Sequence, residues 1–223
     1  MAESKLRLSI IAISMILIIG GTFYKVHHDK QQEIKRIEQE IEAEKLRKAK
    51  QREELNQLFD LHITNFKNEL KENASSYKNS RLVLKEIFSP HNFETKEYTK
   101  EIYSLFKNNV APNLRAKANE IINIFVKYKE LLENDMSTHD SDTKKQFLLK
   151  WHEASQEQLN KYIDFFTKEE ELIQAYEELV TFYYVHSNLF SVDIKNNIFL
   201  FDREEDKRAE TKIKNKIQSI KRK

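Results

Sequence analysis

Glycine and proline are scarce in this chain of 223 residues, which contains two of each. Both glycines, Gly20 and Gly21, lie in the apolar N-terminal segment, so none follows Tyr24. Tight hairpins, phosphate-binding loops and nucleophile elbows depend on positive φ angles, which glycine adopts most readily. The scarcity argues against a β-rich or doubly wound fold, and helix-forming Lys, Glu, Leu, Ile and Gln dominate instead. We therefore expect an all-α protein.

Cysteine is absent, which excludes disulfides, thiol nucleophiles and lipid attachment through a cysteine. The chain is long enough to bury a core without disulfides. Known catalytic spacings are missing as well: His152-Glu153 begins like a zinc-protease helix, but Gln156 occupies the position of the second histidine. Serine-nucleophile motifs and the Glu-x-x-His di-iron pattern do not occur. We expect a protein that is not an enzyme and holds no cofactor.

One polar stretch is dense in metal-ligand residue types: Asp135, His139, Asp140 and Asp142. It lacks both the glycine and the final glutamate of a calcium-binding loop. An ordinary loop over residues 134–142, with Ser141 or Asp142 capping the next helix, explains the same residues. We therefore predict no metal site there.

Long hydrophobic runs are also lacking, except for the seventeen uncharged residues of Leu8–Tyr24. Such a helix is about 25 Å long, and Lys5, Arg7 and Lys25 can extend to the interfaces of a core of about 30 Å. We predict a flank at 1–7 and a transmembrane anchor at 8–24. The alternative is a cleaved signal peptide, although no A-x-A-like site follows.

The orientation of this anchor is not decided by charge, because basic residues lie on both sides of it. The absence of cysteine favours an oxidising compartment outside the cytoplasm. We therefore expect a single-pass protein of a bacterial inner membrane, with its amino terminus inside and its body facing the periplasm or the outside.

The next segment, residues 25–54, is almost entirely charged or Gln. Ile34, Ile37 and Ile41 begin a heptad pattern, but the next core positions are polar. Glu44 and Lys48 have the i,i+4 spacing of a helix-stabilising ion pair. The pattern predicts a solvated helical stalk, and a homodimeric coiled coil is the alternative.

Apolar residues then recur with helical period in three runs within residues 55–201, separated near Ser89-Pro90 and in the 134–142 loop. This organisation predicts an elongated, antiparallel three-helix bundle running up, down and up, with a fourth helix as a variant. His62 lies on the apolar stripe, so we expect it to be partly buried and hydrogen-bonded.

Three features could interrupt these helices. Residues 73–76 are poor helix formers and mark a weak point in the first run. Pro112 either kinks the second run or opens a new helix. Thr167 with Glu170 has the spacing of a capping box, which could restart the third run.

The pattern changes beyond Phe190. Short apolar stretches flank Asn196-Asn197, so this segment forms either a small hairpin or an irregular strap across the end of the bundle. The segment 202–223 then carries nine cations and five acids, whereas 59–201 has a net charge of −4. Its Ile213, Ile217 and Ile220 lie on one helical face. This basic helical tail could bind an acidic membrane, pack on the bundle or remain frayed.

Candidate binding residues come from two places. Phe182, Tyr183 and Tyr184 are consecutive and cannot all face one core, so we expect a docking face there. The full set of predicted surface-binding residues is Tyr183, Tyr184, Lys212, Lys214, Lys216, Lys221, Arg222 and Lys223. The tail lacks the interleaved aromatics of a specific nucleic-acid binder.

These features predict a membrane-tethered, non-enzymatic interaction or adaptor protein that presents a helical bundle to a protein partner at the cell envelope. One alternative is a receptor or sensor for a small ligand, with an aromatic-lined pocket at the end of the bundle. The other is a membrane-active or immunity-type protein that acts through its transmembrane helix, where Gly20-Gly21 permits close helix approach.

Overall fold

The computed structural model describes the backbone of residues 2–222 and the side chains of residues 27–222. It is mostly helical, which confirms the all-α class. Its elements are α1 (Ala2–Ile87), the 3-10 turn η1 (Pro90–Phe93), α2 (Lys96–Leu105), the π-helical turn η2 (Phe106–Val110), α3 (Ala111–Asp135), α4 (Ser141–Val185), β1 (Phe190–Asp193), β2 (Ile198–Phe201) and α5 (Glu204–Arg222). The chain divides into two compact units, Met1–Leu58 and Phe59–Lys223.

The first unit consists of α1 residues up to Leu58. Ile34, Ile37 and Ile41 are about half exposed, and Lys48 Nζ lies 2.7 Å from Glu44 Oε1, which confirms that i,i+4 pair. The predicted anchor Leu8–Tyr24 lies outside the residues whose side chains are described. Over the described residues, no stretch of helix combines the length and apolarity needed to cross a bilayer.

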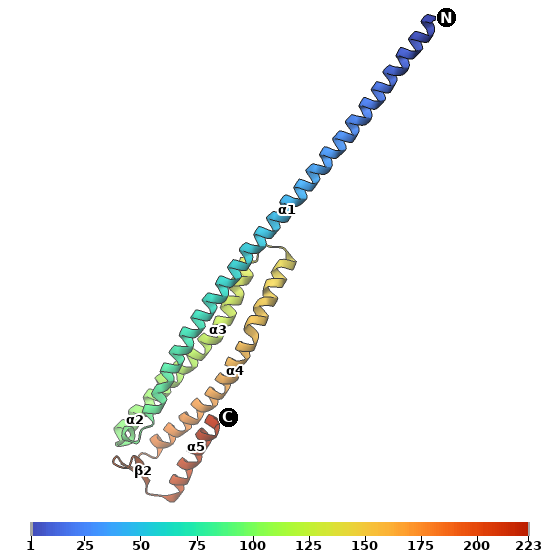
Figure 1. Ribbon diagram of the computed structural model, residues 1–223. Helices are drawn as coiled ribbons and strands as arrows, with labels where there is room; N and C mark the ends of the chain where they lie inside the picture. The colour runs from blue at the N-terminus through green and yellow to red at the C-terminus, as the bar shows by residue number, and fades with distance from the viewer. Residues whose placement is uncertain (1, 223) are drawn as a thin grey trace. The chain divides into compact units, whose positions relative to one another are not determined.

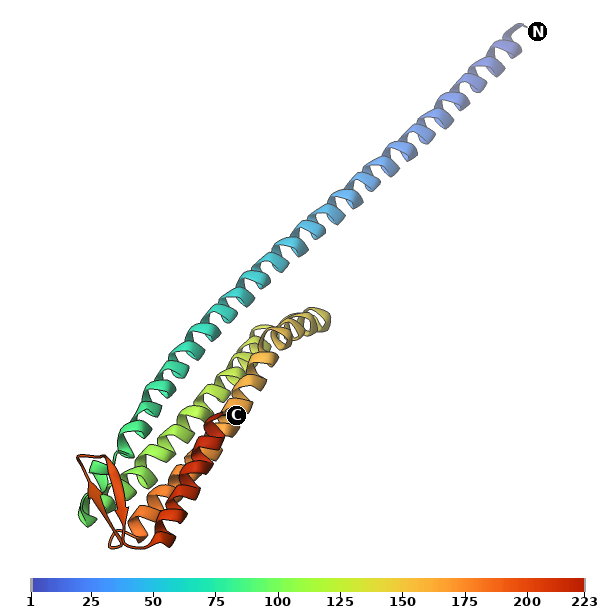
Figure 2. The same cartoon turned by 60° about the horizontal axis from the view of Figure 1, so that its bottom comes forward.

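The second unit is an antiparallel helical bundle. The α1 residues 59–87 run in one direction, α2 and α3 return, and α4 runs back again (Figure 1). The α5 helix then lies alongside α4, as both views show (Figure 2). The predicted up-down-up arrangement is therefore present, and α5 supplies the fourth helix.

Neither long helix of this unit has the expected interruption. The Asn73 side chain donates to the Glu69 carbonyl at 2.9 Å, so the polar stretch continues α1. The Thr167 hydroxyl donates to the Ile163 carbonyl at 2.8 Å, and α4 passes through this position without a new start. A break at 73–76 and a restart at Thr167, both of which the sequence allowed, are therefore absent from α1 and α4.

Pro112 lies in the first turn of α3, which was one of the two alternatives expected for it. The π-helical turn at Phe106–Val110 leads directly into α3, and the Ala111 N–H donates to the Phe106 carbonyl. A π turn is wider than an α turn, so it relieves the clash between a proline ring and the carbonyl four residues earlier. The helical path therefore continues across residues 96–135.

The loop between α3 and α4 is shorter than 134–142. Its last residue, Asp140, caps α4 by accepting hydrogen bonds from the Asp142 and Thr143 N–H groups at 3.1 and 3.0 Å. Sequence reasoning placed this cap one or two residues late, at Ser141 or Asp142, because all three residue types favour the position.

Of the two alternatives for the segment beyond Phe190, the structure shows the hairpin. Strands β1 and β2 pair antiparallel, with Phe190 opposite Phe201. Asn197 supplies the positive φ of the turn, 55°, and Asp193 Oδ1 accepts from the Asn196 N–H at 3.1 Å. Asparagine takes the place of glycine here because it tolerates the left-handed region better than other residues.

Three buried tyrosines join neighbouring helices in one recurring way. Each phenol donates to a glutamate on another helix, and that glutamate also binds a cation. The sets are Tyr77–Glu169–Arg81 between α1 and α4, Tyr128–Glu69–Lys127 between α3 and α1, and Tyr183–Glu210–Lys214 between α4 and α5. We call them the three tyrosine–glutamate links.

The links change the acidity of their members. Burial and the Glu69 hydrogen bond raise the pKa of Tyr128 to about 12. Burial and the adjacent glutamates also raise the pKa values of Tyr77 and Tyr183. The Lys127 ammonium holds the pKa of Glu69 below its ordinary range. Each link is therefore strongest with a neutral phenol and a charged carboxylate.

The basic segment at the C-terminus is α5, and it packs on α4. Ile213 and Ile217 are buried, while Ile220 is half-buried. Of the three alternatives for this segment, the structure shows packing on the bundle. Its apolar face therefore contributes to the core of the second unit.

Raising the pH should reveal the tyrosine–glutamate links. The pKa of Tyr128 rises from 10.0 to about 12 on folding, so its stabilising contribution is complete below pH 10 and is lost as the pH passes 12. Tyr128→Phe should make the fall in unfolding free energy over this window shallower, by up to about 1.4 kcal/mol per pH unit. Urea denaturation at a series of pH values measures the slope, and Tyr98→Phe, at an exposed position, is the control. Identical slopes for the two variants would contradict the assignment.

Shortening a buried side chain of α5 tests its docking. Ile217→Ala should lower the free energy of unfolding by about 2–4 kcal/mol, because it removes buried methylene groups and leaves a cavity. Leu149→Ala, at a position 56% exposed, should change it by less than about 0.5 kcal/mol. Urea unfolding followed by circular dichroism compares them, and equal losses would show that α5 is not docked.

Candidate binding groove between α1 and α4

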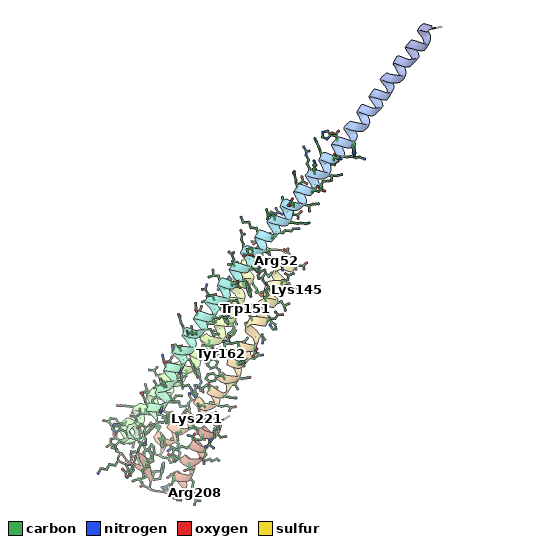
Figure 3. All side chains as sticks on the ribbon, viewed as in Figure 1. Arg52, Lys145, Trp151, Tyr162, Arg208 and Lys221 are labelled. Atoms are coloured by element: carbon green, nitrogen blue, oxygen red, sulfur yellow. The ribbon has the colours of Figure 1, made fainter. Side chains whose placement is uncertain are left out.

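Aromatic side chains of α1 and α4 form the floor of a groove in the second unit. The Tyr77 ring lies 5.1 Å from that of Phe166 and 6.0 Å from that of Phe165, centroid to centroid. Tyr162 stacks on Phe166 at 5.9 Å, and Figure 3 labels its position on α4. Residues 162, 165 and 166 share one helical face, which explains their convergence. Phe165 stays 42% exposed, so part of this floor faces solvent.

The groove has measurable volume. Its deeper part encloses about 470 Å³, and a neighbouring part of about 340 Å³ shares Ala74, Lys78, Gln158 and Tyr162 with it. Ala74 lines both parts, and its single methyl group leaves room between the larger side chains. The two parts form one trough that follows α1 from Lys67 to Arg81, a length of about 21 Å at 1.5 Å per residue.

The rim of the trough is basic. Its cations are Lys67, Lys71, Lys78 and Arg81 on α1 and Lys161 on α4. No aspartate or glutamate is among the described residues that line it. Lys67, Lys71 and Lys78 form no ion pair with the described residues, whereas Lys161 pairs with the exposed Glu157 at 2.6 Å. The surface thus combines an apolar floor with uncompensated positive charge.

The Tyr77–Glu169–Arg81 link fixes one end of the trough. Glu169 is 6% exposed, and its carboxylate accepts from Arg81 at 2.6 and 2.8 Å and from the Tyr77 hydroxyl at 3.0 Å. The hydrogen bonds that Arg81 donates to Glu169 raise the pKa of its guanidinium. This carboxylate therefore holds two groove residues in place while remaining buried beneath them.

A second hollow of about 670 Å³ lies between α3 and α4, with different chemistry. Its one arginine, Arg115, is bound by Glu170 at 2.8 and 2.9 Å and by Glu177 at 3.0 Å. The Arg115 guanidinium holds the pKa of Glu170 below its ordinary value. Its positive charge is neutralised from within the protein, so this hollow lacks the attraction for anions that the α1–α4 groove has.

The histidine that the sequence places on the apolar stripe forms a pair with an aspartate. His62 Nε2 lies 2.6 Å from Asp135 Oδ2 with its side chain 13% exposed, which confirms a partly buried, hydrogen-bonded histidine. Within residues 27–222, no group of three or more His, Asp or Glu side chains has the arrangement of a metal site. The groove itself holds aromatic, amide and ammonium groups.

The predicted docking tyrosines have opposite environments. Tyr183 is 1% exposed and hydrogen-bonded to Glu210 at 2.8 Å, so the prediction that it binds a partner at the surface was wrong. Its ring stacks on Phe199 of the hairpin at 4.4 Å, which closes that end of the bundle. Tyr184 is 38% exposed and stacks on Tyr103 at 4.4 Å. At this end of the bundle, Tyr183, Phe93 and Phe199 pack against one another.

The predicted cations of the tail contact the bundle in three cases. Lys214 lies 5.2 Å from the centre of the Phe199 ring, and it also pairs with Glu210 within α5. Lys216 pairs with Glu178 at 2.7 Å, and Lys221 lies 5.5 Å from the centre of the Tyr176 ring. Lys212 and Arg222 are exposed. Lys223 lies outside the described residues.

Sequence reasoning missed the groove, although a signal for it was present. Lys67, Lys71 and Lys78 recur with helical spacing beside the apolar stripe of the first run. Such a row is usually a solvated face, and only the folded bundle places the aromatics of α4 next to it.

No family model, curated protein or solved structure matches this chain. The groove is therefore interpreted from its own geometry and charge.

Removing the buried carboxylate should destabilise the bundle. Glu169→Ala leaves the Tyr77 hydroxyl and the half-buried Arg81 without their partner, at a cost of about 2–4 kcal/mol in unfolding free energy. Glu157→Ala, which breaks the exposed pair with Lys161 on the same helix, should leave the unfolding free energy nearly unchanged. Chemical denaturation measures both. A loss at Glu169 no larger than that at Glu157 would refute the anchoring role.

Proposed function

We propose that this protein is a membrane-tethered, non-enzymatic binding protein, whose helical bundle captures a partner in the α1–α4 groove. The observation that carries the proposal is the groove itself, which combines an apolar floor with lysines that form no ion pair with the described residues. In most proteins the core covers the aromatic side chains, and neighbouring groups pair with the surface charges. A concave site that leaves aromatic surface and positive charge open to solvent is therefore the default candidate for binding.

The tether rests on the sequence of Leu8–Tyr24. Seventeen uncharged residues bounded by Arg7 and Lys25 suit a short spanning helix with basic ends. The orientation that we propose keeps the amino terminus in the cytoplasm and places the bundle outside, at the envelope. A tethered bundle meets partners at the membrane surface, which suits an adaptor better than a freely diffusing protein.

Among the functions expected from sequence, the groove favours those that need an exposed recognition surface. An interaction protein and a small-ligand receptor both require an exposed recognition surface, and this trough supplies one on the side of the bundle. The tail cations that contact the bundle are less available for that role. The groove is therefore the part of the molecule to which we assign partner binding.

Membrane fractionation tests the tether. The full chain should remain with membranes after high-salt and alkaline washing, because an inserted helix is held by the hydrophobic effect and not by charge. A chain beginning at Val26 should be released. A chain in which an unrelated spanning segment replaces Leu8–Tyr24 is the matched control and should behave as the original does.

A reporter fused after Lys223 tests the orientation in the same cells. Alkaline phosphatase fused there should be active and a fluorescent protein dark, since each matures in only one compartment. Release of the full chain by washing would overturn the tether, and the opposite reporter pattern would overturn the orientation.

A further inference from the structure

The groove has a chemistry that specifies its ligand more closely than the proposed function does. We propose that it binds a single-chain anionic amphiphile, with the acyl chain along the aromatic floor and the acidic head group among Lys67, Lys71 and Lys78. This inference rests on the proposed function, because it names the ligand class of the same groove.

The charge of the rim selects an anion. Lys67, Lys71 and Lys78 line the trough without an ion pair among the described residues, although residues 59–201 carry a net charge of −4. Arg81 and Lys161 also line it, but they are paired with Glu169 and Glu157. Positive charge is therefore concentrated here against the overall sign of the bundle. Lys71 and Lys78 are seven residues apart, about two helical turns, so their ammonium groups lie on the same side of α1. An acidic head group between them gains two charge-assisted hydrogen bonds.

The shape of the floor selects a slim apolar body. A volume of about 470 Å³ falls in the range of small-ligand pockets, about 300–1,000 Å³. An α-helix with its side chains is about 10–12 Å across, and a docked helix would place only side chains in such a trough. A single acyl chain follows the length of about 21 Å along α1 and covers Ala74, Tyr77 and Phe165.

The floor also argues against a nucleic acid. Bases stack on open aromatic faces, which must be exposed and evenly spaced along the strand. Here Tyr77 is buried, Tyr162 and Phe166 are half-buried, and only Phe165 is substantially exposed. The aromatic rings pack mainly on one another, so they present an apolar trough and not a series of stacking platforms.

Lysine acetylation followed by mass spectrometry provides the test. The full chain is held in a neutral bilayer disc and titrated with octanoate, decanoate or dodecanoate, and the reactivity of Lys67, Lys71 and Lys78 is compared with that of the exposed Lys100 and Lys145. We expect protection at the three groove lysines only. Each added methylene should lower the concentration that gives half-maximal protection about fourfold, the equivalent of about 0.8 kcal/mol, until the trough is filled. Dodecanol, which lacks the negative charge, should need at least a tenfold higher concentration than dodecanoate for half-maximal protection.

Two sets of variants locate the ligand. Lys71→Glu with Lys78→Glu should weaken protection of Lys67 at least tenfold, whereas the control pair Lys100→Glu with Lys145→Glu should leave it unchanged. Ala74→Trp should block the trough, and Ala118→Trp in the α3–α4 hollow is its matched control. The charge-reversal variants change exposed positions only, so they remain informative if a tryptophan variant fails to fold.

Three further arms separate the competing ligands. An acidic amphipathic peptide or an oligonucleotide that protects the groove lysines when dodecanoate does not would overturn the amphiphile and leave the binding function standing. Protection by a disc of anionic two-chain lipid alone would assign the groove to the bilayer surface and also overturn the proposal. If none of these anions protects the groove lysines, the amphiphile and the binding role of the groove both fall.

Discussion

A glutamate that accepts from a buried tyrosine of another helix and also binds a cation is the interaction on which this bundle depends. It occurs at the α1–α4, α1–α3 and α4–α5 contacts, through Glu169, Glu69 and Glu210. Glu169 and Glu210 are buried, and Glu69 is half-buried. A buried carboxylate is costly unless it is neutralised and hydrogen-bonded. Each link meets both needs and also fixes the rotation of two helices about their axes, because the phenol and the carboxylate must meet at one position along each helix.

The large aromatic side chains between α1 and the other helices account for the groove. The backbones of α3 and α4 run close together, whereas α1 meets them through large rings such as Phe66, whose centroid is 4.9 Å from that of Trp151 and 5.0 Å from that of Phe125. Rings of this size hold α1 away from α4. Where the small Ala74 replaces a ring, the separation is not filled, and the trough opens there. Removal of the Tyr77–Glu169 bond would thus change the groove and the stability of the bundle together.

Hydrophobic periodicity and the loop residues between the runs predicted the helices and their antiparallel order, because these signals lie close together in sequence. The hairpin was one of two alternatives, offered by Asn196-Asn197. The errors have tertiary causes. Thr167 has a capping pattern but lies within α4, since packing of the surrounding apolar stripe outweighs a local cap. Tyr183 was expected at the surface, but β2 and α5 cover it after folding. The groove forms only when α1 and α4 lie side by side. Lining residues such as Lys71 and Gln158 are 87 positions apart in sequence, so no local pattern could define it.

The distribution of charge explains why two basic segments have different roles. On α5, Lys214, Lys216 and Lys221 lie against acidic or aromatic side chains of the bundle, so their charge stabilises the fold. On α1, Lys67, Lys71 and Lys78 face a trough without a described acid, so their charge remains available to an incoming anion. Net charge cannot separate the two cases, because both segments are basic within an acidic bundle. The deciding quantity is whether a carboxylate lies within reach after folding, and this favours the groove over the tail as the site of binding.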